Sequence, residues 1–260
     1  MRGVVAETVH RLQADPEFAG VHASLATYYG DGDRDAKMDR LYRRFVPDGG
    51  LAFDVGAHVG DRTACFRRCG ARVVAVEPQP ICAQTMEALF GADLDVTLVA
   101  EGCADKSGSV VFHLNNKNPT VSTASSAFIA HAAGADGWVE QVWDQTITVR
   151  TTTLDALIKA HGQPDFIKID VEGFEDVVLN GLSAAPPALS FEFTTIQRDC
   201  AFAALARLKA IGQFRCNLAL GESQQLLFDA EREVSIDEMA DVIKNLPHAA
   251  NSGDVYAVRI

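Results

Sequence analysis

Short apolar runs alternate along the chain with stretches in which apolar positions recur at helical spacing. Residues 51–55, 72–76 and 95–100 form the runs, and residues 62–69 and 81–90 lie between them. This alternation predicts a parallel sheet with helices on both faces. We therefore expect an α/β domain that begins near residue 48 and extends to residue 260.

Two segments depart from the alternation. Residues 1–47 show helical spacing on both sides of a Gly-Asp loop, which predicts an N-terminal helical cap or a lid, with Tyr28 and Tyr29 as substrate-facing candidates. Residues 108–150 contain two strand-like runs around a stretch rich in Ser, Ala, Asn and Gly. We expect an inserted hairpin whose loop, residues 115–144, contacts the substrate.

Regular alternation returns at Thr153, a plausible N-cap for a helix that stops at Gly162. Further apolar runs follow, and the last three are predicted to close the sheet with antiparallel additions at its edge. These last runs are FRCNLAL at 214–220, QQLLF at 224–228 and DVYAVRI at 254–260.

Composition narrows the class of protein. The chain has 260 residues, 48% of them hydrophobic, and a formal net charge of −12, which argues against a non-specific grip on nucleic acid. No stretch approaches the about 20 apolar residues of a membrane span, so no membrane partner is expected. Six cysteines without a CxxC pair signal neither zinc nor disulfides, and the N-terminus lacks a secretory pattern. We expect a cytoplasmic protein.

Residues 51–80 carry the most informative motif. The first apolar run contains Asp54, then Gly56 and Gly60 bracket a turn, and Glu77 ends the next run. Glycines let the backbone approach a ligand, and an acid at the second strand end can accept hydrogen bonds from both ribose hydroxyls. The turn lacks the GxGxxG pattern that holds a pyrophosphate, which favours a nucleoside cofactor without phosphate.

Other interpretations of this motif stay open. The glycines can simply shape a strand-to-helix turn, with Glu77 as a solvated strand end. An NAD(P)-dependent oxidoreductase would share Glu77 but would require a turn that cradles phosphate. A third possibility is a non-catalytic binding module that keeps the fold.

Acids at the ends of apolar runs form the second constellation. Ligands bind outside the carboxyl ends of parallel strands, so Asp54, Glu77, Asp170 and Glu192 are expected to face one cleft. If the strand before Asp170 continues through residue 171, Lys168, Asp170 and Glu172 share one face. The alternative is structural, with Lys168 and Asp170 as an ion pair and Glu172 or Glu175 capping the next helix.

Together DVGAHVG with VEP, TLDAL, DFIKIDVEGFEDVVLNGL and the terminal GDVYAV resemble the FkbM family of S-adenosylmethionine-dependent methyltransferases. The resemblance covers residues 51–260, and IKIDVEGFE is its most specific part. It implies a class I methyltransferase fold, which is Rossmann-like, with a seven-stranded sheet of order 3-2-1-4-5-7-6 and an antiparallel last strand. It also implies S-adenosylmethionine as cofactor and methylation of a hydroxyl group on a small molecule, such as a sugar or a natural product.

The resemblance also assigns residues. It implies cofactor contacts by Asp54, Gly56, Ala57, His58, Gly60, Glu77, Pro78, Asp105 and Asp170. In this assignment Glu77 holds the ribose hydroxyls, Asp105 accepts from the adenine amine, and Asp170 lies beside the reacting methyl. His58 departs from the family pattern, in which Asn is common at this position, and the change is expected to affect substrate access more than binding.

Methyl transfer to an alcohol requires alignment of three atoms and removal of a proton. Asp170 is the first candidate for the general base and Glu192 the second, with Lys168 orienting a carboxylate or lowering its pKa. His58 and His113 are alternatives. A divalent metal held by Asp170, Glu172 and Glu192 is conceivable, but nothing in the spacing requires one, and no metal is predicted.

Overall fold

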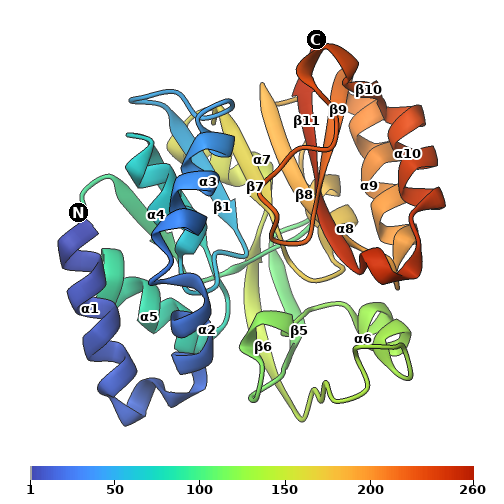
Figure 1. Cartoon of the computed structure of the whole chain (residues 1–260). Coiled ribbons are helices and arrows are strands. Elements are labelled where there is room, and N and C mark those ends of the chain that lie inside the picture. The colour runs from blue at the N-terminus through green and yellow to red at the C-terminus, as the bar shows by residue number, and fades with distance from the viewer. Residues whose placement is uncertain (1) are drawn as a thin grey trace.

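Eight strands form the central sheet of the computed structural model, which describes residues 2–260 (Figure 1). Along the sheet the strands lie in the order β10-β9-β11-β8-β7-β1-β2-β3. Their bounds are β1 Leu51–Val55, β2 Arg72–Val76, β3 Val96–Val99, β7 Phe166–Ile169, β8 Ala188–Thr194, β9 Phe214–Leu220, β10 Val234–Ser235 and β11 Ser252–Arg259.

The strand order confirms the predicted fold class. Counted in chain order, the strands from β3 to β9 have the arrangement 3-2-1-4-5-7-6, and β11 runs antiparallel to both β8 and β9. The sheet has one strand more than predicted, because residues 234–235 pair with β9 and add β10 at the edge. The prediction of a strand at 224–228 is wrong, since that segment makes only an isolated bridge between Leu226 and Ala219.

Helices cover both faces of the sheet, as the alternation predicts. One face carries α4 (Asp61–Arg68) and α5 (Pro80–Phe90). The other face carries α7 Leu154–His161, α8 Glu175–Asn180, α9 Arg198–Ile211 and α10 Ile236–Asn245. Alternate residues of β1 serve the two layers, since Ala52 packs with α4 and α5 while Phe53 and Val55 pack with α7 to α10.

The N-terminal helices pack on the same face as α4 and α5 (Figure 1). They are α1 Arg2–Ala14, the 3₁₀ helix η1 Pro16–Val21, α2 His22–Tyr28 and α3 Gly32–Tyr42. Leu12, Met38 and Tyr42 are buried in one hydrophobic cluster with Phe66 and Phe90. Since residues 2–42 share this cluster with the sheet layer, they are part of its packing, and a lid motion stays a prediction.

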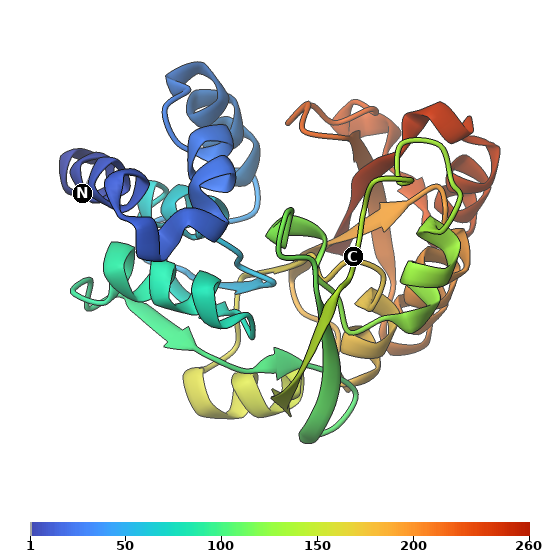
Figure 2. The same ribbon diagram turned by 90° about the horizontal axis from the view of Figure 1, so that it is seen from below.

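A second, smaller sheet lies below the central one in Figure 1 and is seen from below in Figure 2. It contains β4 (Gly102–Cys103), β5 (Gly108–Leu114) and β6 (Gln145–Thr152) in the order β4-β6-β5. β5 and β6 are antiparallel, and the segment between them carries η2 (Pro119–Val121) and α6 (Ser126–Ala132). Two short 3₁₀ helices, η3 Ala230–Arg232 and η4 His248–Ala250, complete the elements of the described residues.

Local signals at α7 are confirmed. The side chain of Thr153 accepts a hydrogen bond from the backbone N–H of Ala156 at 3.0 Å, and the helix ends at Gly162, whose φ of 100° favours glycine. Among residues 2–260 no helix combines the length and the apolar character needed to cross a bilayer. In parallel sheets of this kind, ligands bind at the carboxyl ends of the strands.

Candidate active site

A cavity that is partly open to solvent lies where β1, β2 and β7 end and where the smaller sheet approaches them. These three strands are parallel neighbours, so their carboxyl ends share one edge. Among the residues singled out from the sequence, the cavity is lined by Tyr28, Gly56, Ala57, His58, Glu77, Pro78, Lys168, Asp170 and Glu172. The glycine turn and the acidic strand end therefore lie in one site.

Gly56 forms the first corner of the turn after β1. Its φ is 79°, and a Cβ at this position would lie 1.7 Å from the backbone oxygen of Asp170. The backbone N–H groups of Gly56 and Ala57 donate to the carbonyl of Val76 at 2.9 and 3.1 Å. The turn is thus held against the ends of β2 and β7 at once, and only glycine fits there.

Gly60 has a different role from the one predicted. It precedes α4 with a φ of 82°, and a Cβ there would lie 2.4 Å from the sulfur of Met86 and 2.5 Å from the ring of Phe90. It is buried and does not line the cavity. The glycine allows close packing between the turn and α5, rather than close approach of a ligand.

Glu77 is held by the backbone at the end of β2. Its Oε2 accepts from the N–H of His58 at 2.8 Å and its Oε1 accepts from the N–H of Gln79 at 2.7 Å. The side chain is 8% exposed, and burial raises the pKa of Glu77 to about 7. A carboxylate has about four acceptor positions, so each oxygen keeps capacity for a ligand hydroxyl.

Two of the predicted cofactor contacts lie outside the cavity lining. Asp54 is completely buried on the α4 face, where its Oδ2 accepts from the hydroxyl of Thr63 at 2.6 Å. It lies one residue before the end of β1 and is not among the residues that line the cavity. Asp105 lies in an exposed turn, and the cavity is lined instead by Gly102 and Cys103 of β4.

His58 lines the cavity with a neutral ring. Burial lowers the pKa of His58 to about 4, its Nδ1 is 3.3 Å from the sulfur of Cys82, and its Nε2 is 3.4 Å from the hydroxyl of Thr120. The ring of Tyr28 approaches it edge-on, with the centroids 6.0 Å apart. A neutral imidazole with neighbours on both nitrogens is poorly placed to take a proton from an acceptor. His113, the other alternative base, does not line the cavity and has its Nε2 3.3 Å from the hydroxyl of Ser126.

Lys168 and Asp170 form the ion pair that was the structural alternative. Lys168 Nζ lies 2.5 Å from Asp170 Oδ2, and Lys168 is 1% exposed. Burial opposes ionisation of Asp170, but the charge of Lys168 prevails and lowers the pKa of that carboxyl. The same contact raises the pKa of Lys168, although burial acts against it. The pair is therefore ionised at neutral pH.

The expectation that the strand continues through residue 171 is wrong. β7 ends at Ile169, and Glu172 has a φ of 57° in the turn that follows. Glu175, the first residue of α8, accepts from the N–H groups of Val171 and Gly173 at 2.9 and 3.3 Å. Glu175 therefore stabilises the turn. The bend of the chain in this turn, and not the alternation of side chains along a strand, brings Glu172 close to Asp170.

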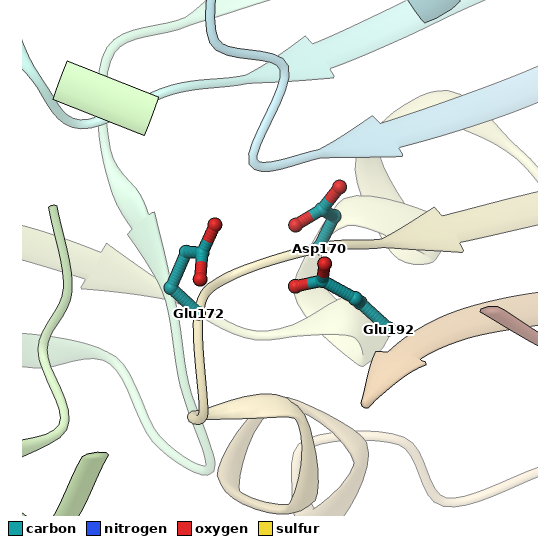
Figure 3. A group of neighbouring side chains, drawn as sticks. All are labelled: Asp170, Glu172 and Glu192. Atoms are coloured by element: carbon teal, nitrogen blue, oxygen red, sulfur yellow. The ribbon is translucent and has the colours of Figure 1, made fainter. Parts of the chain in front are cut away.

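Three carboxylates converge beside the cavity. One oxygen from each of Asp170, Glu172 and Glu192 lies within 4.8 Å of the others, and Figure 3 shows the three groups directed toward a common space. Glu192 comes from β8, and its Oε2 is buried without a hydrogen-bond partner. Burial first, and then the neighbouring carboxylates, raise the pKa values of Glu172 and Glu192 well above the ordinary range.

The sequence did not reveal a second charged network that lines the cavity. Asp61 pairs with Arg62 at 2.5 Å and with Arg34 of α3 at 2.8 Å, and Arg62 reaches Glu222 at 3.1 Å. Burial opposes ionisation of Asp61, but the two arginines lower the pKa of that carboxyl to about 2. The position of Asp61 and Arg62 directly after Gly60 was a usable signal, whereas nothing in the sequence links Glu222 to this site.

The smaller sheet supplies an apolar wall. Val110 and Phe112 of β5 and Val149 of β6 line the cavity. Trp138 and Trp143, two aromatic residues of the segment between these strands, pack edge-on against Phe128 instead. The inserted segment therefore contributes mainly apolar surface to the site.

The parallel sheet, the glycine turn and the acid at the end of β2 together define an α/β enzyme with a nucleoside site, of the class I methyltransferase type. The sequence profile of the methyltransferase FkbM domain matches residues 54–246. The chain belongs to this family and is an S-adenosylmethionine-dependent methyltransferase. No curated protein sequence matches the chain.

Solved structures with a similar arrangement include three methyltransferases. A TehB-like SAM-dependent methyltransferase from Corynebacterium glutamicum has a TM-score of 0.48 at 11% identity, covering 94% of this chain and 97% of its own. A SAM-dependent O-methyltransferase from Thermotoga maritima has a TM-score of 0.44 at 12% identity, covering 93% of this chain and 71% of its own. A precorrin-6y C5,15-methyltransferase from Geobacter metallireducens has a TM-score of 0.43 at 11% identity, covering 87% of this chain and 86% of its own. At such values these similarities say nothing of the acceptor.

The cavity fits the methyl donor. Glu77 presents two backbone-held oxygens suited to a pair of ribose hydroxyls, next to a turn whose Gly56 and Ala57 line the cavity. When bound, S-adenosylmethionine supplies a methyl group on a positively charged sulfur. The acidic wall formed by Asp170 and Glu172 suits that charge.

Proposed function

We propose that this methyltransferase transfers its methyl group to a hydroxyl oxygen of a small molecule, such as a sugar or a natural product. The observation that carries the proposal is the pair formed by Asp170 and Glu192, two carboxylates within 4.8 Å of each other at adjacent strand ends beside the donor cavity. A hydroxyl group loses a proton as its oxygen forms the new bond, and a carboxylate in reach of that oxygen accepts it.

The two carboxylates have unequal roles in this proposal. Lys168 holds Asp170 ionised and fixed, which suits a group that orients the acceptor hydroxyl by accepting its hydrogen bond. The pKa of Glu192 is raised, which favours its protonated form, so Asp170, whose pKa is lowered, is the carboxylate available to accept the proton. Asp170 remains the first residue to test, because it is the one of the two that lines the cavity.

The remaining residues position the reactants and exclude water. In-line transfer needs the acceptor oxygen, the methyl carbon and the sulfur in one line. The turn at Gly56 fixes the donor side, while Phe112 and Val149 provide an apolar wall against which a small acceptor can pack. The acidic surroundings and the net charge of −12 favour such an acceptor over nucleic acid. The six cysteines are all free thiols, which supports a reducing, cytoplasmic setting.

The test is methyl transfer from isotopically labelled S-adenosylmethionine to a panel of sugars, phenols and polyketide alcohols, with product NMR to identify the methylated atom. We expect the label in an O-methyl group, and we expect its loss in Asp170→Asn. A product methylated at nitrogen or carbon, or label found in added RNA, would contradict the proposal. Donor binding without transfer to any hydroxyl would support a non-catalytic binding module instead.

A further inference from the structure

The cluster of Asp170, Glu172 and Glu192 has more negative charge than the chain balances. Glu172 is 8% exposed, and its carboxylate receives no hydrogen bond or ion pair from any of residues 2–260. Figure 3 shows this unpartnered group on the same side of the turn as the other two carboxylates, with the three groups facing a common space. Burial of an unpaired carboxylate costs free energy. A positively charged partner in the space between the three groups would offset this cost.

Lys168 is not a partner for Glu172 or Glu192. Its ammonium contacts Oδ2 of Asp170, and no ion pair with Glu172 or Glu192 is present among the described residues. Oε2 of Glu192 is buried and also lacks a partner. When all three carboxylates are ionised, the one bound ammonium leaves two negative charges uncompensated, which equals the charge of one divalent cation.

We propose that Asp170, Glu172 and Glu192 bind a divalent cation that prefers oxygen ligands, such as Mg²⁺, Mn²⁺ or Ca²⁺. The spacing of the carboxylates supports this. Oxygens on opposite sides of Ca²⁺ are about 4.6–5.2 Å apart, and those on opposite sides of Mg²⁺ about 4.0–4.2 Å apart. Three oxygens cannot all be opposite one another, and at angles of 90–120° around Ca²⁺ they lie about 3.3–4.5 Å apart. Separations of up to 4.8 Å therefore require a small closure of the three side chains around Ca²⁺ and a larger one around Mg²⁺.

The cluster has protein on one side and the donor cavity on the other. Asp170 and Glu172 line the cavity, whereas Glu192 approaches from β8 behind them. Three carboxylates leave the remaining positions of a six- to eight-coordinate ion to water or to oxygens of an acceptor. The contact with an acceptor rests on the proposed function. The binding of the ion does not, because it needs only the three side chains.

Calorimetric titration of the metal-stripped chain with Mn²⁺, Mg²⁺ and Ca²⁺, in the absence of donor and acceptor, tests the site. We expect one Mn²⁺ per chain with a change in its electron paramagnetic resonance spectrum, and a Kd about tenfold or more higher in Glu172→Gln and in Glu192→Gln. Glu87→Gln, an exposed residue of α5, is the matched control and should bind like the wild type. Wild-type affinity in both cluster variants, or no binding at millimolar Mn²⁺, would overturn the proposal.

Thermal unfolding separates a cation from a shared proton, since Glu192 also lies within hydrogen-bonding reach of Asp170. With a chelator, both glutamine variants should melt above the wild type because each removes a like charge. Added Mn²⁺ should raise the Tm of the wild type and of Glu87→Gln but not of the cluster variants. An unchanged Tm of the wild type in Mn²⁺ would show that protons alone hold the cluster. Methyl transfer that persists without metal, despite Mn²⁺ binding, would refute only the contact with the acceptor.

Discussion

The donor side and the acidic side of the cavity treat buried carboxylates in opposite ways. On the donor side, both oxygens of Glu77 accept from backbone N–H groups. On the acidic side, Glu172 and one oxygen of Glu192 have no partner among residues 2–260. The backbone fixes the carboxylate of the first region before a ligand binds. The carboxylates of the second region keep free acceptor positions for a group that binds with the substrate.

Gly56→Ala should have the largest effect, because it changes the contact that joins the two sides. The added Cβ would lie 1.7 Å from the backbone oxygen of Asp170, at a φ of 79°. We expect roughly 4 kcal/mol loss of unfolding free energy, or a displaced turn with little donor binding. Urea unfolding and calorimetry measure both. Gly134→Ala, with a φ of 84° and open space around it, separates strain from crowding and should cost about 1–2 kcal/mol.

Asp170→Asn should reduce kcat by about 10²–10⁴-fold while the Kd of the donor changes much less, since the side chain acts on the acceptor. Its amide also leaves Lys168 without its ion-pair partner. Steady-state kinetics with donor titration separate the two parameters. Asp199→Asn, an exposed residue in the first turn of α9, is the control. A similar loss in kcat and in donor affinity would assign Asp170 to the donor side.

Glu77→Gln should weaken donor binding by about 100-fold with unchanged fold. In the amide, one of the positions that now accept from His58 N–H and Gln79 N–H becomes a donor, so two N–H groups face each other. Calorimetry with S-adenosylmethionine measures the effect, and Glu87→Gln again serves as control. Retained affinity would mean that the ribose hydroxyls bind elsewhere.

Stability should fall as pH rises from about 4 to 7 in the ligand-free protein. Burial raises the pKa of Asp254 to about 6 and that of Glu77 to about 7, above their values in the unfolded chain. A raised pKa stabilises the folded state at low pH, and this stabilisation is lost as pH passes through the folded value. We expect the free energy of unfolding, measured with urea, to fall by roughly 2 kcal/mol across this range. Asp254→Asn should flatten the curve, and an unchanged slope would argue against the raised pKa.

His58→Asn should have the smallest effect, with donor affinity within about threefold of the wild type. The contact with Glu77 uses the backbone N–H of residue 58, and Asn adopts a φ near the observed 49° readily. The ring contacts with Cys82 and Thr120 would be lost, so any change should appear in the KM of the acceptor. A large loss of donor affinity would show that the ring itself contacts the cofactor.

The sequence predicted the sheet order and brought Glu77, Gly56 and Asp170 to one edge, because strand ends and glycine turns are local signals that follow a known sheet rule. It misplaced Asp54, since the two faces of β1 are not distinguished by an apolar run. The bend after Ile169 escaped prediction because it depends on Glu175 accepting backbone N–H groups. Glu222 could not be placed because its partners are distant in the chain.

The smaller sheet has a consequence for how such an enzyme can change its substrate. β6 pairs with both β4 and β5, and among the described residues none of these three strands pairs with a strand of the central sheet. Substitutions or insertions between residues 108 and 152 can therefore remodel the apolar wall of the cavity without shifting the register that holds Glu77 and Asp170. We therefore expect that replacing residues 108–152 as one segment changes the acceptor that fits the cavity while the pairing of the central sheet is kept.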